Sequence, residues 1–322
     1  MHYVLFLLLC FVWGTNFILM KKAMLAFDPV GVAVLRVAGG LLPLLVVWLM
    51  RREKWPLGRE YIFPLLLVAL FGYSWPFIVQ PLLIQQIDGS GFIGMMVCFV
   101  PLLTILVSVP LLGIFPKPRQ TIGVVIGLVC SGIILLTGRE QHAMSWWLIA
   151  LAASVPLFYA VTNTYIKRRF VGVKALPLTV ASLAISTAML TPVALTWHGG
   201  PEGKATAGTS VVSATIDQDI EASAPADSSV LPILCVVLLG VVGTGLGILI
   251  FNKLLQEQGP LFAGMVTYLI PLIALFWGVV DGERVYAVQL VAFAGVLVSV
   301  ALVQFGRLPP SRLTARGEGA SS

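Results

Sequence analysis

The chain has 322 residues, of which 58% are hydrophobic and only 11% are charged, and its mean hydropathy is +0.98. Soluble domains are about half apolar and a quarter charged, so this composition excludes an ordinary soluble protein and indicates one embedded in lipid. The net charge of +6 lies mostly in short connections between apolar runs, where it sets topology and does not indicate a nucleic-acid partner.

Ten apolar runs are long enough to cross a membrane, for which a helix needs about 20 residues. In chain order they lie near 3–22, 30–50, 61–83, 90–112, 120–137, 145–166, 175–197, 230–254, 261–280 and 286–305. The first run is followed, not preceded, by Lys21-Lys22 and has no A-x-A-like cleavage site, so we expect a retained helix instead of a signal peptide. The sequence therefore predicts an all-α membrane protein with ten transmembrane helices.

Basic residues divide unequally between the two sides of this predicted bundle. If the N-terminus is cytoplasmic, the cytoplasmic connections and the tail 307–322 hold 14 Lys and Arg residues, and the other side holds 5. The remaining basic residue, Arg36, lies inside the second run. Because positive charge collects on the cytoplasmic side, we expect a multi-pass protein of the inner cell membrane with both termini in the cytoplasm.

The one long connection, 198–229, is rich in Gly, Ala, Ser and Thr and cannot bury enough apolar surface to order itself, so we expect a flexible external loop. The sequence of residues 199–206 is similar to a phosphate-binding loop motif. No strand precedes it, however, and Lys204 is followed by Ala205 where the motif has Ser or Thr. The four cysteines lie in apolar runs without a CxxC pair, and the three histidines are dispersed. We therefore expect no cofactor, no metal and no ATP site.

A segment around the fourth run recurs around the ninth. Residues 86–102 align without a gap with residues 256–272, at an offset of 170, and seven of the 17 aligned residues are identical, including Gln, Gly and Pro. A fainter match pairs Trp13-Gly14-Thr15-Asn16 with Tyr159-Ala160-Val161-Thr162 at an offset of 146, and the long loop accounts for the difference. Helices one to five and six to ten are therefore predicted to be copies of one unit.

Because five is an odd number, the second copy must be inverted in the membrane. We assign the first repeat to residues 1–140, the second to 141–306 and a cytoplasmic tail to 307–322. Many secondary transporters are built from inverted repeats, with the substrate site near the midplane where the halves meet. Duplicated helical units also occur in membrane enzymes and channels, so the architecture favours transport without requiring it.

Several short motifs, in this order and spacing, resemble a known family. They are Trp13-Gly14-Thr15-Asn16-Phe17, Asp28-Pro29 followed by Arg36, Phe99-Val100-Pro101-Leu102, Gly259, Tyr268-Leu269-Ile270-Pro271-Leu272, and Gly282-Glu283 with Gln289 beyond. The chain resembles the drug/metabolite transporter superfamily, EamA type, with ten helices and two repeats. The resemblance covers nearly the whole chain except the loop and the tail. It implies a carrier of metabolites, amino acids or toxic compounds with few bound cofactors.

The first repeat departs from this family pattern at the end of its fourth helix. Gly113-Ile114-Phe115 stands where the family carries Gly-Glu. A mechanism that needs a carboxylate at this position of both repeats is therefore in doubt.

Arg36 is the first candidate for substrate contact. It lies about seven residues into the second helix, roughly 10 Å below the external surface. A charge at this depth usually faces a cavity or a partner, and the Arg fork binds carboxylates well. The alternatives are an ion pair with Asp281 or Glu283, or a side chain that reaches the interface.

The other cavity candidates are aromatic or amide side chains near prolines or on the faces of paired helices. Asn16 and Trp13 share a face of the first helix, where they can line a cavity or bridge two helices. Their counterparts on the sixth helix are Tyr159 and Asn163. Prolines break helices near transporter sites but are often merely tolerated. The candidates beside prolines are Tyr73, Trp75, Gln80 and Tyr268.

Carboxylates are scarce within the predicted spans. Asp281 and Glu283, at the external edge of the ninth helix, are the candidates for proton coupling or ion pairing. We predict a secondary transporter of small metabolites that exports by alternating access, with a small-molecule substrate and the lipid bilayer as partners. The alternatives are a membrane enzyme acting on lipid-linked substrates, or a scaffold or sensor. Substrate, direction, coupling and oligomeric state stay open.

Overall fold

The structure is a computed structural model that describes residues 2–51, 58–113, 115, 117–141, 145–197, 227–257, 263 and 266–304. Every regular element in these ranges is helical. Up to residue 141 the elements are α1 (His2–Ala23), α2 (Pro29–Arg51), η1 (Arg59–Tyr61), α3 (Ile62–Val68), η2 (Ala69–Ser74), α4 (Trp75–Ile87), α5 (Ser90–Met96), η3 (Val97–Phe99), α6 (Val100–Leu112) and α7 (Pro118–Gln141). Beyond it they are α8 (Trp146–Arg169), α9 (Ala175–Thr196), α11 (Asp227–Leu238), η4 (Leu239–Leu246), α12 (Gly247–Glu257), α14 (Val266–Val280) and α15 (Ala287–Gln304). The predicted external loop, except for its last three residues at the start of α11, and the predicted tail lie outside the described ranges.

Seven of the predicted runs form helices long and apolar enough to cross a membrane. The three other predicted runs, the fifth, ninth and tenth, contain the shorter apolar helices Thr121–Ile134, Leu269–Val280 and Ala287–Ser299. Large apolar side chains remain exposed on the outer surface of the bundle, such as Val46, Leu49 and Met50 on α2. Lipid is the solvent that such a surface needs, so the chain is a multi-pass membrane protein.

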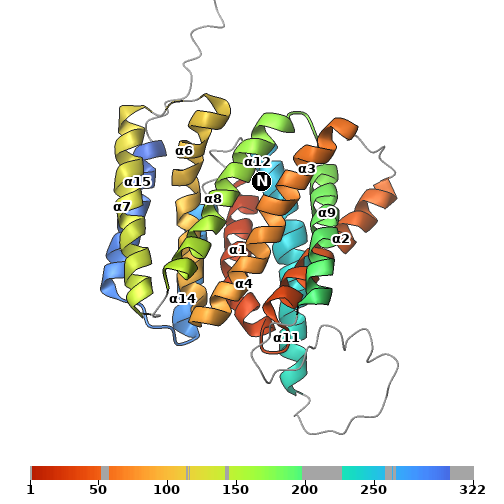
Figure 1. The fold of residues 1–322 in the computed structure, drawn as a ribbon, viewed down its shortest axis with the longest axis horizontal. Coiled ribbons are helices and arrows are strands. Elements are labelled where there is room, and N and C mark those ends of the chain that lie inside the picture. The colour runs from red at the N-terminus through yellow and green to blue at the C-terminus, as the bar shows by residue number, and fades with distance from the viewer. Residues whose placement is uncertain are drawn as a thin grey trace, which may run out of the picture.

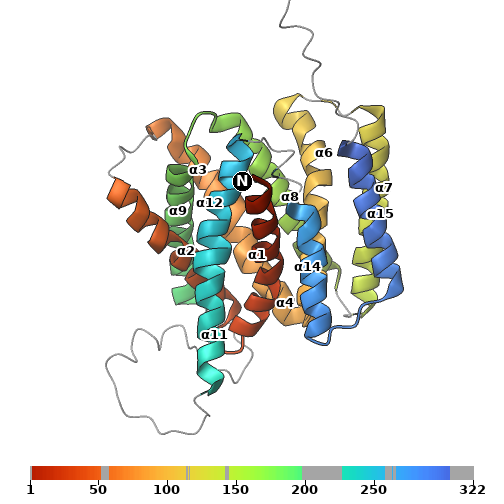
Figure 2. The ribbon, with the colours of Figure 1, turned by 180° about the vertical axis from the view of Figure 1, so that it is seen from behind.

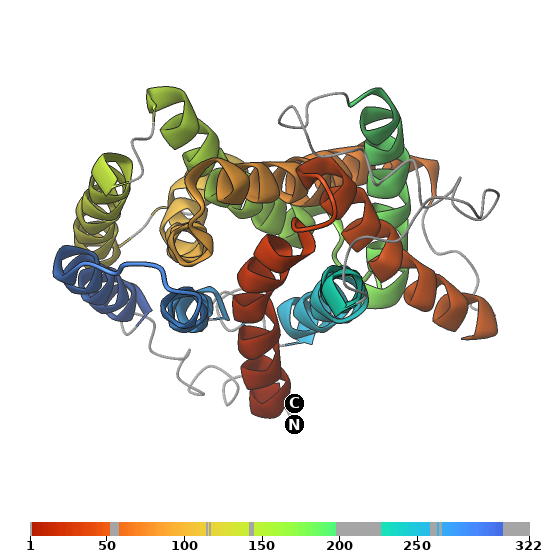
Figure 3. The same cartoon turned by 90° about the horizontal axis from the view of Figure 1, so that it is seen from below.

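Helix α1 lies between α14 on one side and α11 with α12 on the other (Figures 2 and 3). Helix α2 packs against η4 and against α9. The helices α7 and α15 form a pair at one edge, beside α6 and α14 (Figure 1). The core therefore forms where helices from both sequence repeats meet.

The equivalent helices α1 and α8 run in opposite directions. Near its C-terminal end α1 carries Lys21, which contacts Asp88 just before α5 begins. Near its own C-terminal end α8 carries Arg168, which contacts the carbonyl of Leu111 where α6 ends. Since α5, η3 and α6 are continuous, these contacts lie at opposite ends of the bundle, which we call the Lys21 end and the Arg168 end. Inverted repeats require this arrangement.

Two π-helical segments, η2 and η4, begin 170 residues apart, which is the offset of the sequence repeat. In η2 the cause is Pro76, because a proline ring clashes with the carbonyl four residues earlier, here that of Gly72, and a wider turn relieves the clash. No proline stands at the same place after η4, which instead contains Gly240, Gly243 and Gly245. The backbone irregularity is therefore shared by both repeats although different residues produce it.

Candidate functional site

A cavity of about 100 Å³ lies where the two repeats meet, and most of its walls are apolar or aromatic. Helices α1, α2, α4, α6, α8, α12 and α14 and both π-helical segments contribute to its lining. Seven of the nine cavity residues predicted from the sequence line it: Trp13, Asn16, Arg36, Tyr73, Gln80, Tyr159 and Asn163.

Of the other two candidates, Trp75 does not line the cavity. Trp75 is 37% exposed, and its indole Nε1 donates a hydrogen bond of 2.9 Å to the Ser154 hydroxyl on α8. Residues two apart on a helix point to different sides, so Trp75 faces outward while Tyr73 faces the cavity. The expectation for Trp75 is therefore corrected. The side chain of Tyr268 lies outside the described part of the structure.

Arg36 is only 3% exposed and reaches the cavity from α2. Its Nε donates to the Thr244 hydroxyl over 3.2 Å, its Nη1 approaches the Met20 sulfur at 3.3 Å, and its guanidinium carbon lies 3.8 Å from the centre of the Phe77 ring. None of the described carboxylates lies within ion-pair distance of it, so the predicted alternative of a pair with Asp281 or Glu283 is not formed. Of the five guanidinium N–H groups, two have a partner among the described residues and three remain available.

The aromatic wall of the cavity is held by hydrogen bonds between helices. Trp13 Nε1 donates to the carbonyl of Gly243 over 3.0 Å, and its ring centre lies 5.1 Å from that of Phe251. Across the cavity, Gln80 Nε2 donates to the Tyr159 hydroxyl over 3.3 Å. These bonds join α1 to η4 and α4 to α8, so the candidates fix the relative positions of the two repeats as well as lining the space.

Asn16 and Thr162, which the offset of 146 makes equivalent, occupy matching places against the two π-helical segments. A methyl group added to Gly243 would lie 2.2 Å from Asn16 Oδ1, and one added to Gly72 would lie 2.7 Å from Thr162 Cγ2. The side-chain oxygens of Asn16 and Thr162 are buried and have no hydrogen-bond partner among the described residues.

Sequence reasoning missed four polar residues of this site. Thr162, Asn252 and Thr267 line the cavity, and Thr244 bonds Arg36 from η4. The repeat alignment already paired Thr162 with Asn16 and could have identified it. Nothing in the sequence could have placed Thr244 next to Arg36, because the two are 208 residues apart.

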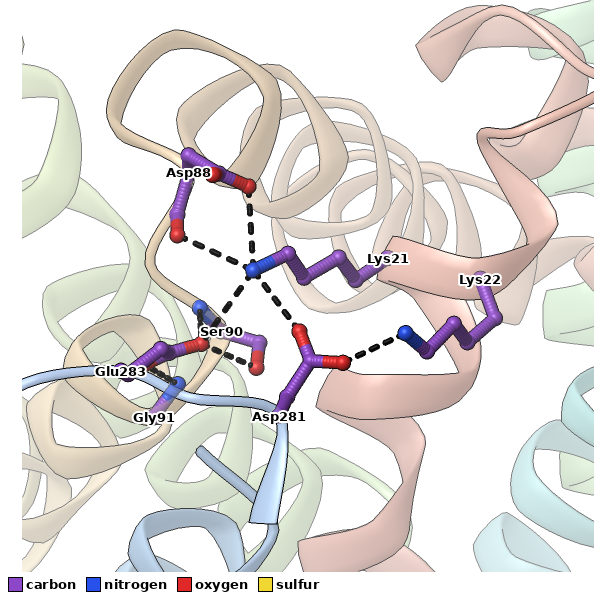
Figure 4. Close-up of polar contacts among 7 residues, drawn as sticks. All are labelled: Lys21, Lys22, Asp88, Ser90, Gly91, Asp281 and Glu283. Atoms are coloured by element: carbon purple, nitrogen blue, oxygen red, sulfur yellow. Dashed lines mark hydrogen bonds and ion pairs between the residues drawn. The ribbon is translucent and has the colours of Figure 1, made fainter. Parts of the chain in front are cut away.

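Asp281 and Glu283 lie at the Lys21 end, in a cluster that joins α1, α5 and α14 (Figure 4). Lys21 Nζ is 2.9 Å from Asp281 Oδ2, 3.0 Å from Asp88 Oδ1 and 3.7 Å from Glu283 Oε1, and Lys22 also pairs with Asp281. Glu283 accepts hydrogen bonds from the backbone N–H and the hydroxyl of Ser90, both at 2.7 Å, and from the backbone N–H of Gly91 at 2.9 Å. Its carboxylate thereby caps the first turn of α5.

The charge state of Asp281 follows from these contacts. Burial acts to raise the pKa of the carboxyl, but hydrogen bonds from Lys22 and Lys21 and the positive charges of both lysines outweigh it, and the pKa lies below its ordinary value. Asp281 is therefore ionised at neutral pH and engaged with its partners.

Comparison with known proteins places this architecture in a family. The family model described as "EamA-like transporter family" matches residues 1–138 and 146–305. No curated protein matches the sequence. A solved structure described only as "Crystal structure of protein" shares the fold, with a TM-score of 0.62 at 16% identity over 94% of this chain and 96% of that one. The two matched segments cover nearly the whole chain and agree with the resemblance seen in its motifs, so the chain belongs to the EamA-like transporter family, whose members are membrane transporters of small molecules and not enzymes.

Proposed function

We propose that the chain is a secondary transporter that exports small amphipathic metabolites, such as amino acids or toxic compounds, by alternating access, and that Arg36 binds an anionic group of the cargo. The observation that carries the proposal is a buried guanidinium in the central cavity with three N–H groups available and no described carboxylate nearby. A buried charge without a counter-ion is costly, and an anionic ligand with two oxygens fits the Arg fork. The apolar and aromatic walls suit the remainder of such a molecule.

The charge asymmetry of the sequence supports an orientation for this transporter. With both termini in the cytoplasm, the Lys21 end faces outward and the Arg168 end faces inward. Asp281 and Glu283 then lie at the outer end, each engaged by cationic or N–H donors. We assign them an ion-pairing role and not proton coupling, because a coupling carboxylate must exchange its proton during the cycle.

Reconstituted vesicles provide the test, with a panel of L-leucine, L-threonine, L-phenylalanine and 4-methylpentanoate, each with and without a pH gradient. We expect saturable flux for at least one carboxylate. R36Q should raise its half-saturation concentration about tenfold or more, because a charge-assisted hydrogen bond contributes roughly 1.5–3 kcal/mol. R36K keeps the charge but not the fork and should fall between R36Q and wild type.

The matched control is W75F, which alters an aromatic side chain outside the cavity and should leave the half-saturation concentration within about twofold of wild type. If no compound of the panel shows saturable flux, the carrier proposal is contradicted. If R36Q and W75F behave alike, Arg36 does not bind the cargo.

A further inference from the structure

The backbones of the two repeats come close together where α2 crosses the π-helical segment η4. A Cβ atom added to Gly40 would lie 2.7 Å from the backbone nitrogen of Gly245, and one added to Gly245 would lie 2.6 Å from the carbonyl oxygen of Gly40. Glycine at both positions lets the two backbones come this near, because a side chain on either residue would meet the backbone of the other.

Arg36 lies one helical turn before Gly40, on the same face of α2, and is joined to η4 by a side-chain bond. The Thr244 hydroxyl accepts from Arg36 Nε at 3.2 Å and donates its single hydrogen to the carbonyl of Leu239 at 2.9 Å. Thr244 is fully buried and does not line the cavity, so it has no evident contact with cargo of its own. Its hydroxyl connects the guanidinium of one repeat to the first residue of the π-helical segment of the other.

The same crossing exists in the other half of the molecule without a cation. At the offset of 170 the counterpart of Thr244 is Ser74 in η2, whose hydroxyl lies 2.8 Å from that of Ser186 on α9. At the offset of 146 Ser186 is the counterpart of Gly40, and the counterpart of Arg36 is Ser182. The chain therefore contains one hydroxyl that is hydrogen-bonded to a cavity cation and an equivalent one that is not.

We propose that Thr244 is a positioning residue for Arg36, and that through it the second repeat sets the direction in which the guanidinium presents its free N–H groups. This inference rests on the anion-binding role proposed above. The hydroxyl engages Nε, Met20 engages one N–H of Nη1 and Phe77 covers one face of the guanidinium, which leaves the second N–H of Nη1 and both of Nη2 for the cargo. Cargo recognition is thereby shared between repeats that must move relative to each other during alternating access.

The test uses T244V, which keeps the shape of the side chain and removes the hydroxyl, and the carboxylate of the panel that wild type transports best. We expect the half-saturation concentration to rise about three- to tenfold, the effect of one buried hydrogen bond, with maximal flux within about twofold of wild type. T244S keeps the hydroxyl, so its half-saturation concentration should lie within about twofold of the wild-type value. S74A, the matched control in the other repeat, should leave it unchanged.

A double-mutant cycle separates this role from a general effect on folding. If Thr244 acts through the guanidinium, T244V should add less than about twofold on an R36K background. An effect as large in R36K as in wild type, or an equal effect of S74A, would overturn the positioning role while leaving the carrier proposal intact. Should T244V not fold, T244S against T244A in both backgrounds gives the same comparison. Absence of saturable flux in wild type contradicts the carrier proposal itself.

Discussion

The two ends of the bundle have the same local fold but different chemistry. At the Lys21 end α14 is followed by Asp281 and Gly282, and at the Arg168 end α6 is followed directly by Gly113. Both glycines adopt the left-handed backbone, with φ of 88° and 66°. The residue after the first is Glu283, and the residue after the second is Ile114. The residue that follows the left-handed glycine is therefore a carboxylate at one end only.

The basic residues on the opposing helices differ in what they contact. Lys22 pairs with the Asp281 carboxylate, whereas its counterpart Arg168 donates to the backbone carbonyl of Leu111. Lys21 contacts three carboxylates. Separating helices at the Lys21 end must break several partly buried charged contacts, whereas the counterpart of Lys22 at the Arg168 end makes only an exposed hydrogen bond among the described residues. A few residues can thus make the state that is open at the Lys21 end and the state that is open at the Arg168 end unequal in free energy, although the repeats share one fold.

Of the substitutions at the two ends of the bundle, E283A should cause the largest loss of stability. It removes the acceptor for three donors at the first turn of α5, two of them backbone N–H groups. We expect a loss of roughly 2–4 kcal/mol in the free energy of unfolding, seen as a lower thermal unfolding temperature in detergent. R168Q at the other end should cost less than about 1 kcal/mol, because its contact is exposed. Equal losses in the two variants would show that the ends do not differ.

D281N should have a smaller effect. The amide keeps the shape and some hydrogen bonding of Asp281 but leaves Lys21 and Lys22 without its charge, although Lys21 retains Asp88 and Glu283. The lysines reach partly into solvent, so we expect a loss of about 1 kcal/mol in thermal unfolding experiments. The loss should shrink in high salt, which screens exposed charges. If the stability lost in D281N did not depend on salt, Asp281 would stabilise the fold by packing and not by its charge.

The fold was predictable because hydropathy and the repeat are properties of sequence. Apolar runs of membrane length and the recurrence of Gln, Gly and Pro at one offset require no knowledge of packing. The π-helical segments were not predictable, since η2 depends on Pro76 but η4 arises among glycines with no proline at the matching place. Helix ends also differ from those predicted by hydropathy. Helix α11 begins at Asp227, whereas the predicted apolar run begins near residue 230.

The sequence indicated which residues line the cavity better than it indicated which residues they contact. Side chains with charged or hydrogen-bonding groups near helix centres are costly in lipid, and seven such residues do line the cavity. Their partners depend on helix rotation, which one sequence does not determine. Arg36 therefore meets Thr244 and Phe77 instead of Asp281, and Trp75 faces Ser154.

The smallest expected effect concerns the acid stability that Asp281 contributes at the Lys21 end. The pKa of Asp281 is lower in the folded protein than its ordinary value near 4, so the unfolded chain takes up the proton first as pH falls. The stability contributed by this carboxylate is complete above about pH 4 and is lost as pH falls through the lowered pKa. The unfolding temperature of wild type should therefore fall more steeply than that of D281N between about pH 5 and pH 3. Parallel curves for the two proteins would mean that the lysines do not hold the pKa of Asp281 down, and R168Q, which changes no carboxylate, should follow the wild-type curve.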